Sequence, residues 1–295
     1  MDRPSLARQE RTGQLLGYAG LIFVVLVIGL PMFWMLSSSV KTLDQIYTFP
    51  PQWIPTDPQW SNYSEAWNAV PFGRFYINSI IITVLGAGLQ IINGTLCAYA
   101  FAFLKFPGKN WLFLIVLAAL MVPSEVVILP NFLFFGNRVR EWFNLDTNWI
   151  NTYQAIVLPG AATAFGTFLM RQGFMGLPRD VLDAAKVDGA GHLRTMFGIV
   201  LPMAKPIVIT FGLISVVNKW NDYLWPLVIA RPTTMRPEEL RPITVGVRLL
   251  FDAEGNNNWG VIMAGTTFVV LPLIIVYVFA QRFIIDGLTA GATKG

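Results

Sequence analysis

The sequence predicts an all-α polytopic membrane protein with six transmembrane helices. Hydrophobic residues make up 54% of the 295 residues and charged residues only 13%, about half the charged share of a typical soluble domain. Because unpaired backbone groups are costly in lipid and alternating strand patterns are absent, we expect the spans to be helices. Four runs lack Asp, Glu, Lys and Arg, and each exceeds the roughly 20 residues that a helix needs to cross a bilayer. They are Thr12 to Val40, Phe75 to Leu104, Thr147 to Met170 and Gly255 to Gln281.

Two further apolar runs contain isolated charges. Asn110 to Asn137 contains only Glu125, and Ile207 to Ala230 contains only Lys219 and Asp222. The first apolar run is longer than the roughly 7–15 residues of a signal sequence and no small-residue cleavage site follows it, so we expect it to remain as a helix. The six expected spans lie near residues 15–38, 77–104, 111–136, 150–170, 206–229 and 258–281.

The distribution of Lys and Arg predicts the orientation in the membrane. If both termini are cytoplasmic, the inner segments carry twelve basic residues and the outer loops carry eight. The excess of basic residues on the cytoplasmic side of membrane proteins favours this orientation, with residues 1–14 and 284–295 as cytoplasmic tails. The net charge of +4 therefore reflects topology, and nothing in the sequence indicates nucleic-acid binding.

The first span leads into a long outer loop, so that residues 15–72 form one section of the chain. Residues 40–74 of this loop are rich in Pro and in aromatic residues, including Trp53, Trp60 and Trp67. We interpret the rings as an aromatic belt at the membrane interface. The alternative is a contact surface for an external partner.

A polar island separates the fourth and fifth expected spans, from Leu177 to Pro206. Pro178 suits the first turn of a helix, and Gly189 is placed to end that helix in a left-handed conformation. A second helical segment is expected from Leu193 to Val200. We predict two short helices at an angle, forming a rigid knob on the cytoplasmic side. The alternative is an ordinary amphipathic loop between spans.

The spacing within this loop resembles the EAA loop of permease subunits of bacterial ATP-binding-cassette (ABC) importers. Asp183-Ala184-Ala185 is followed by Gly189 after three residues, by Ile199 after nine more and then by Leu201-Pro202. Asp183 stands where the family usually has Glu. The resemblance implies that the loop docks on a separate ATPase. The implied coupling residues are Asp183, Ala184, Ala185, Asp188, Gly189, Ile199, Leu201 and Pro202.

The resemblance extends over residues 73–283 and implies the type I ABC importer permease fold. Segments PSEV (123–126), WNDYLWPL (220–227) and NNWGVIMAG (257–265) look most similar to permeases for glycerol-3-phosphate and glycerophosphodiesters. A permease for a different sugar, a di- or oligosaccharide, is the alternative.

The resemblance also implies an assembly in the lipid of the bacterial inner membrane. The expected partners are a second homologous permease, an ATPase dimer and an extracytoplasmic substrate-binding protein or lipoprotein. This chain would be non-catalytic and hold no cofactor, because ATP and Mg would bind to the ATPase subunits.

Motifs for independent chemistry are absent from the sequence. There is no G-x-x-x-x-G-K-[ST] motif for binding ATP, and His192 and Cys97 are the only residues of their kinds. A metal cluster or catalytic triad is therefore excluded, which argues against a membrane-bound enzyme. We expect Cys97 to be a small buried apolar residue. An ion-coupled secondary transporter is also considered, but such proteins often show inverted repeats, and none is evident.

Polar residues within the third and fifth expected spans are candidates for the substrate pathway. Ionisable groups inside a membrane are costly and indicate function. Hydroxyl-rich substrates need hydrogen-bonding groups and pack well on aromatic rings, and a phosphate needs a cation such as Lys219. Alternatively, Glu125 pairs with Lys219 for structural reasons alone. The candidates are Glu125, Asn131, Lys219, Trp220, Asn221, Asp222, Tyr223 and Trp225.

Overall fold

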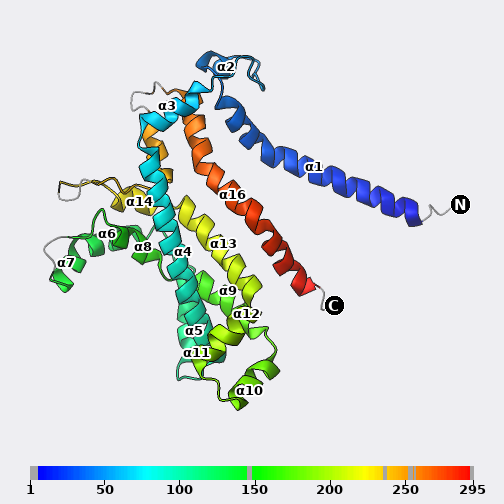
Figure 1. Cartoon of the computed structure of the whole chain (residues 1–295), viewed down its shortest axis with the longest axis vertical. Helices are drawn as coiled ribbons and strands as arrows, with labels where there is room; N and C mark the ends of the chain where they lie inside the picture. Colours follow the sequence, from blue (N-terminus) through cyan, green and yellow to red (C-terminus); the bar gives the residue numbers. More distant parts are fainter. Residues whose placement is uncertain (1–5, 145–147, 235–237, 252–254, 256, 293–295) are drawn as a thin grey trace. The chain divides into compact units, whose positions relative to one another are not determined.

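The computed structural model describes residues 6–144, 148–234, 238–251, 255 and 257–292. The chain forms two compact units. Unit 1 takes in Met1–Val70 and Val247–Leu271, and unit 2 takes in Pro71–Gly246 and Pro272–Gly295. All regular elements in the described part of the chain are helices, which confirms the predicted all-α class (Figure 1).

Three of the expected spans are continuous helices. They are α1 (Leu6–Ser38), α4 (Phe72–Phe103) and α16 (Trp259–Ala292). Their apolar stretches are 26, 32 and 23 residues long, so each is long enough to cross a bilayer.

The fourth expected span is a bent pair of helices. It comprises α8 (Tyr153–Val157), a 3-10 turn η2 (Leu158–Gly160) and α9 (Ala164–Met175), with a bend of 47°. Pro159 cannot donate a backbone hydrogen bond, which accounts for the break at this position.

The fifth expected span follows a sharper bend. The segments His192–Met203 and Lys205–Ile229 meet at 83°. The first contains α11 (His192–Thr195), a π-helical turn η3 (Met196–Val200) and α12 (Leu201–Met203). The second contains α13 (Lys205–Asn221) and α14 (Leu224–Ile229).

The third expected span, 111–136, is not one continuous helix. Helix α5 (Lys109–Ala119) ends after 11 residues, and the chain turns before α6 (Ile128–Leu133), η1 (Phe134–Arg138) and α7 (Val139–Trp142). Pro123 explains the end of α5, because it cannot donate to the carbonyl four residues earlier and disfavours a helical conformation for the residue before it.

The core of unit 2 is built around α4, which packs against α9 and α13. Figure 1 shows α4 and α13 running alongside each other. Small residues permit this approach: a Cβ at Gly94 of α4 would lie 3.3 Å from both Met170 of α9 and Phe211 of α13. Cys97, also on α4, is exposed, so the expectation that it is buried is wrong.

Two cationic side chains from neighbouring helices donate hydrogen bonds to backbone carbonyls at the C-terminal end of α4, near Phe103. Arg171 Nε donates to the carbonyl of Phe101 at 3.1 Å, and Lys109 Nζ donates to that of Leu104 at 2.9 Å. Positive charge at a helix C-terminus is favourable. This end of α4 is therefore held by both α5 and α9.

Buried polar side chains secure the segment after α14 in unit 2. Asn78 of α4 donates to the carbonyls of Glu239 and Arg241 at 2.9 and 3.0 Å, and it accepts from the hydroxyl of Tyr153 at 2.7 Å. Asn151 donates to the carbonyl of Glu238 at 2.8 Å. Residues 238–241 are thus attached to α4 and to the segment preceding α8, and they lead into α15 (Ile243–Gly246).

Unit 1 contains a buried lysine in the turn after α1. Lys41 Nζ donates to the carbonyl of Gln52 and lies 4.2 Å from the centroid of the Trp34 ring. Burial lowers the pKa of Lys41 from its ordinary value, because desolvation disfavours the charged form. Short helices α2 (Leu43–Tyr47) and α3 (Ser61–Ala69) follow, and the second segment of this unit contains a 3-10 turn, η4 (Val247–Leu250), and the first part of α16.

Candidate functional site

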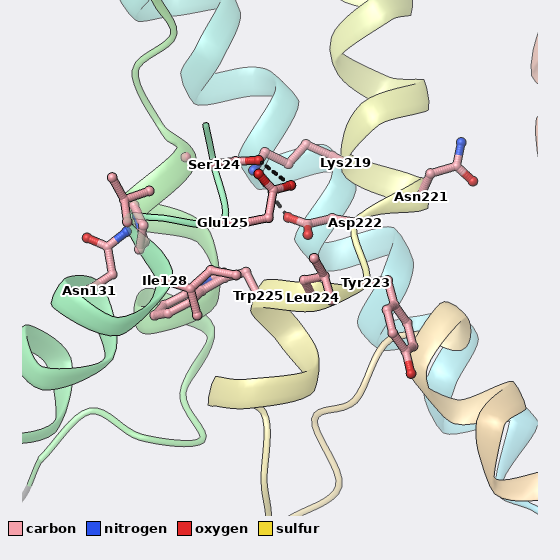
Figure 2. A pocket seen from close by; sticks show the side chains of 13 residues that line it. Ser124, Glu125, Ile128, Asn131, Lys219, Asn221, Asp222, Tyr223, Leu224 and Trp225 are labelled. Atoms are coloured by element: carbon pink, nitrogen blue, oxygen red, sulfur yellow. Dashed lines mark hydrogen bonds and ion pairs between the residues drawn. The ribbon is translucent and has the colours of Figure 1, made fainter. Parts of the chain in front are cut away.

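A pocket of about 430 Å³ lies in unit 2 where α6, η2 and the junction of α13 with α14 meet. Seven of the eight predicted pathway residues line it, and Figure 2 shows their side chains. Sequence analysis identified these residues by polarity within apolar runs, and the fold brings them together from two separate segments. The seven are Glu125, Asn131, Lys219, Asn221, Asp222, Tyr223 and Trp225.

Lys219 is the cation of this pocket, and its side chain passes over two glycines. A Cβ at Gly86 of α4 would lie 2.9 Å from Lys219 Cδ, and a Cβ at Gly160 would overlap its Nζ. Gly160 is held in turn by Gln90, whose Nε2 donates to its carbonyl at 2.7 Å. A side chain at either glycine would therefore collide with Lys219, so the position of the lysine depends on glycine at both sites.

Lys219 forms an ion pair with Asp222, at 3.8 Å between Nζ and Oδ2. The side chains are 11% and 28% exposed, respectively. Asp222 lies in the extended break between α13 and α14. Its backbone carbonyl accepts a hydrogen bond from Thr244 Oγ1 at 2.9 Å. This contact fixes the backbone that carries the carboxylate beside the lysine.

Glu125 lies in the same pocket without a salt bridge to Lys219. Its carboxylate accepts from Ser124 Oγ at 3.1 Å, and the ion pairs of the described residues do not include Glu125 with Lys219. The structure thus gives Lys219 a different partner from the sequence alternative. Asp222 is three residues away, where side chains on one helical face can meet.

Trp225 anchors α14 beneath the pocket. Its indole N–H donates to the carbonyls of Ala155 and Ile156 at 3.0 and 3.2 Å, so the buried indole is satisfied as such groups require. Trp220, by contrast, is buried beside Tyr76, with ring centroids 6.3 Å apart, and does not line the pocket. Its candidacy for the substrate pathway stays a prediction.

Six lining residues of the pocket were not among the predicted pathway residues: Ser124, Val127, Ile128, Pro159, Gly160 and Leu224. Ser124 could have been found from its place beside Glu125. The role of Gly160 depends on contact with a lysine 59 residues later in the chain, and no local pattern reveals such a contact.

The polar island from Leu177 to Pro206 begins with α10 (Arg179–Val187). Gly189 follows with φ of +73°, which confirms the predicted left-handed helix end. The N–H of Ala190 donates to the carbonyl of Ala185 at 2.9 Å, and the N–H of Gly189 donates to that of Lys186 at 3.0 Å. This is the Schellman arrangement, and it turns the chain toward α11.

The loop has an inward face that packs on unit 2. Leu182, Met196 and Val200 join the buried cluster that contains Tyr99 of α4 and Phe174 of α9. Figure 1 shows α10, α11 and α12 gathered at one end of α4. We refer to α10–α12 with their connecting turn as the knob.

The outward face of the knob exposes large apolar side chains: Val187, Leu193 and Phe197. Ala184 is exposed, whereas Ala185 is buried. The two alanines therefore do not share one face of α10, because adjacent helical residues point about 100° apart.

The remaining predicted coupling residues lie at different depths. Asp183 forms an exposed ion pair with Lys186 at 2.6 Å, and the hydrogen bond and charge of Lys186 lower the pKa of the Asp183 carboxyl. Asp188 and Pro202 are exposed, and Ile199 and Leu201 are half-buried. His192 Nδ1 lies 3.4 Å from the hydroxyl of Tyr99.

A family model for binding-protein-dependent transport system inner membrane components matches residues 90–289. The matched region includes the whole knob and all the residues that line the pocket. Among the residues that the structure describes, no cluster of three or more His, Cys, Asp and Glu side chains could hold a metal ion.

Curated relatives cover most of the chain. The arabinooligosaccharides transport system permease protein AraQ of Halalkalibacterium halodurans is 32% identical over 224 residues, covering 76% of this chain and 75% of that protein. The sn-glycerol-3-phosphate transport system permease protein UgpE of Yersinia pestis is 31% identical over 275 residues, covering 91% and 93%. The two names differ in substrate at nearly equal identity.

A solved structure supports the fold. A bacterial ABC transporter involved in the import of the acidic polysaccharide alginate aligns with a TM-score of 0.77 at 23% sequence identity, covering 95% of this chain and 99% of that chain. The predicted type I permease fold is confirmed. Permeases of this family are non-catalytic, and a separate ATPase hydrolyses ATP. The chain belongs to the family of binding-protein-dependent transport system inner membrane components, as a permease subunit of a carbohydrate-type ABC importer.

Proposed function

We propose that this chain forms one half of the translocation pathway of an ATP-driven importer for glycerol-3-phosphate, a glycerophosphodiester or a related sugar or polyol. The UgpE relatives favour the phosphate esters, and the AraQ relatives favour an oligosaccharide as the alternative. The pocket around Lys219 is the proposed substrate contact. The second half of the pathway belongs to a homologous permease.

The observation that carries this proposal is the two-sided knob. Its inner face is attached to unit 2 through Leu182, Met196 and Val200, while Val187, Leu193 and Phe197 remain exposed. Large apolar side chains gathered on a polar loop mark an interaction surface. A separate ATPase is the partner that the loop motif implies, with Asp183, Ala184 and Asp188 among the exposed positions available to it.

The proposed mechanism is alternating access. An ATPase dimer, which holds the ATP and Mg that this chain does not bind, closes and moves the knob. A substrate-binding protein on the outer side then releases its ligand into the pathway. Such coupling requires that each ligand bind the two conformations with different affinity. An ion-coupled secondary transporter would leave the knob without a role, and uptake that persists after deletion of the ATPase would favour it.

The proposed orientation places both termini and the knob in the cytoplasm, as the distribution of basic residues favours. Single cysteines at Gly108 and Gly191, both exposed, can be introduced into a Cys97→Ala chain. They should resist an impermeant thiol reagent added outside intact cells. Rapid labelling at both positions would invert the topology.

The docking role can be tested at Gly189 with a matched control nearby. Gly189 has φ of +73° and Gly191 has φ of −70°. At neither position would a Cβ meet another atom within 4 Å. Gly189→Val forces a β-branched residue into the left-handed region, which costs about 1–2 kcal/mol locally. Gly191→Val introduces the same side chain in an ordinary conformation.

We expect Gly189→Val to reduce substrate-stimulated ATP hydrolysis by the assembled importer at least tenfold, and Gly191→Val to reduce it less than threefold. Both chains should reach the membrane in normal amounts, as measured by immunoblot. Normal stimulated hydrolysis with a well-expressed Gly189→Val chain would contradict a coupling role for the knob.

A further inference from the structure

The pocket around Lys219 contains more negative than positive groups. Of the described residues that line it, Lys219, Glu125 and Asp222 are the charged ones. We propose that this pocket accepts an uncharged, hydroxyl-rich ligand, a neutral sugar or polyol, and disfavours phosphate esters, with Glu125 and Asp222 as the specificity-determining residues. The inference rests on the proposed function and selects among its substrates.

The first argument is charge balance. A phosphate monoester carries a charge of about −1.5 to −2 near pH 7, a phosphodiester carries a single negative charge, and both are bound through cationic donors. Two carboxylates face one ammonium in this pocket, so a single ionised carboxylate is enough to cancel the charge of Lys219. No surplus positive charge then remains among the described lining residues to stabilise a phosphate.

The second argument is that Lys219 is held in position. Its stem lies against Gly86, its ammonium lies against Gly160, and Asp222 is 3.8 Å away. To bind a phosphate directly, the lysine would have to leave Asp222. That movement would leave a carboxylate that is only 28% exposed without its counter-ion, which is costly.

The third argument is the chemistry of the remaining lining. Asn131 and Asn221 provide amide donors and acceptors, and Tyr223 adds an aromatic ring with a hydroxyl group. Figure 2 shows Tyr223, Asn221 and Asn131 on different sides of the Lys219–Asp222 pair. Amides serve as both donors and acceptors, as sugar hydroxyls do, and aromatic faces pack against apolar C–H groups. The volume of about 430 Å³ lies within the range of small-molecule sites.

The charge of the pocket can be measured without knowledge of the substrate. A cysteine is placed at Asn131 in a Cys97→Ala chain of the assembled importer in liposomes, and at Asn221 in a parallel chain. Rates of reaction with cationic, neutral and anionic methanethiosulfonate reagents are compared with those of a small thiol in solution. We expect the cationic reagent to be favoured over the anionic one about five- to tenfold, as one net charge at short range produces.

The carboxylates should account for this preference. Glu125→Gln combined with Asp222→Asn leaves Lys219 alone, and we expect the preference to reverse in favour of the anionic reagent. A cysteine at the exposed Ser64 of unit 1 serves as the control, with rates that the double variant does not change. An anionic preference in the unaltered pocket would overturn the inference. So would a failure of both pocket cysteines to react with any reagent, since the pocket would then be closed to polar ligands.

Transport supplies the second readout. The assembled importer should take up a neutral arabino-oligosaccharide at least tenfold faster than sn-glycerol-3-phosphate, and equal or faster uptake of the phosphate ester would overturn the inference. Because the thiol reaction needs no ATP hydrolysis, a failure of the charge inference can be distinguished from a failure of the proposed transport function. A cationic preference without any ATP-driven uptake would count against the proposed function and leave the charge of the pocket established.

Discussion

Two Asp–Lys pairs with the same sequence separation lie in contrasting parts of unit 2. Asp183 and Lys186 on the knob are 2.6 Å apart, and their side chains are 66% and 73% exposed. Lys219 and Asp222 in the pocket are 3.8 Å apart, but they are 11% and 28% exposed. The shorter pair is therefore the one in water, and the longer pair is the one shielded from it.

The contrast teaches that environment, and not separation, determines what an ion pair contributes. An exposed pair is screened by solvent and gains little from a short distance. A shielded pair is often no more stabilising than apolar residues of similar size, yet removing one partner leaves the other charge without a counter-ion or solvation. The two pairs should therefore respond very differently to the same kind of substitution.

The largest effect is expected from Lys219→Met. The substitution leaves Asp222 without a counter-ion and should destabilise the chain by about 2–3 kcal/mol, less than for a fully buried pair. Thermal unfolding of the detergent-solubilised importer, followed by tryptophan fluorescence, measures the change. Asp222→Asn in the same chain should restore most of the loss.

The exposed neighbour Asn218 provides the control for that experiment, since Asn218→Met adds the same side chain one position earlier. We expect it to change the midpoint of unfolding by less than a third as much. Rescue by Glu125→Gln in place of Asp222→Asn would show that Glu125 is the true counter-ion of Lys219.

An intermediate effect is expected from Gly86→Ala on α4. The new Cβ would lie 2.9 Å from Lys219 Cδ, and the lysine must shift away from Asp222 at a cost of about 1 kcal/mol. Gly88→Ala is the matched control, because a Cβ there meets no atom within 4 Å and alanine favours the helix by up to about 1 kcal/mol. Because the same gain in helix propensity applies at Gly86, the steric cost should appear as a lower unfolding midpoint for Gly86→Ala than for Gly88→Ala. Equal midpoints would mean that Lys219 is not confined by α4.

The smallest effect is expected from Lys186→Ala on the knob. Lys186 lowers the pKa of Asp183 from its ordinary value of 3.8, so the pair stabilises the folded chain above that pH and ceases to do so as the pH falls through the lowered value. Unfolding midpoints of wild type and Lys186→Ala should differ slightly at pH 6 and converge as the pH falls below 3.8 through the lowered pKa of Asp183. A difference that grows on acidification would contradict this assignment.

The helix boundaries of the knob could be predicted because the sequence signals that set them are local. Gly189 ends α10 where a left-handed residue is needed, and Pro178 precedes the first turn, so both signals lie within the segment that they shape. What the pattern could not reveal is which face is attached. Ala185 is buried and Ala184 is exposed, and the local spacing of residues does not indicate which of the two faces the other helices.

The pocket was predictable only as a set of residues. Polar groups inside apolar runs identified Glu125, Lys219 and Asp222, but the counter-ion of Lys219 depends on how α13 ends and on the route of its side chain over Gly86 and Gly160. The break in the third expected span is similar. Pro123 indicated a distortion, whereas the point at which the helix resumes, Ile128, depends on tertiary packing.

Helix α13 has a geometric consequence for the two regions. It begins at Lys205, immediately after the knob, and carries Lys219 in the last turn at its other end. Its 17 residues span about 25 Å at 1.5 Å per residue. A rod of that length that tilts by about 10° at one end moves its other end by about 4 Å, by the same helical dimensions. That displacement is comparable to the separation of Lys219 and Asp222. A small tilt of α13 at the knob is therefore large enough to change the contacts of Lys219 at the other end of the helix.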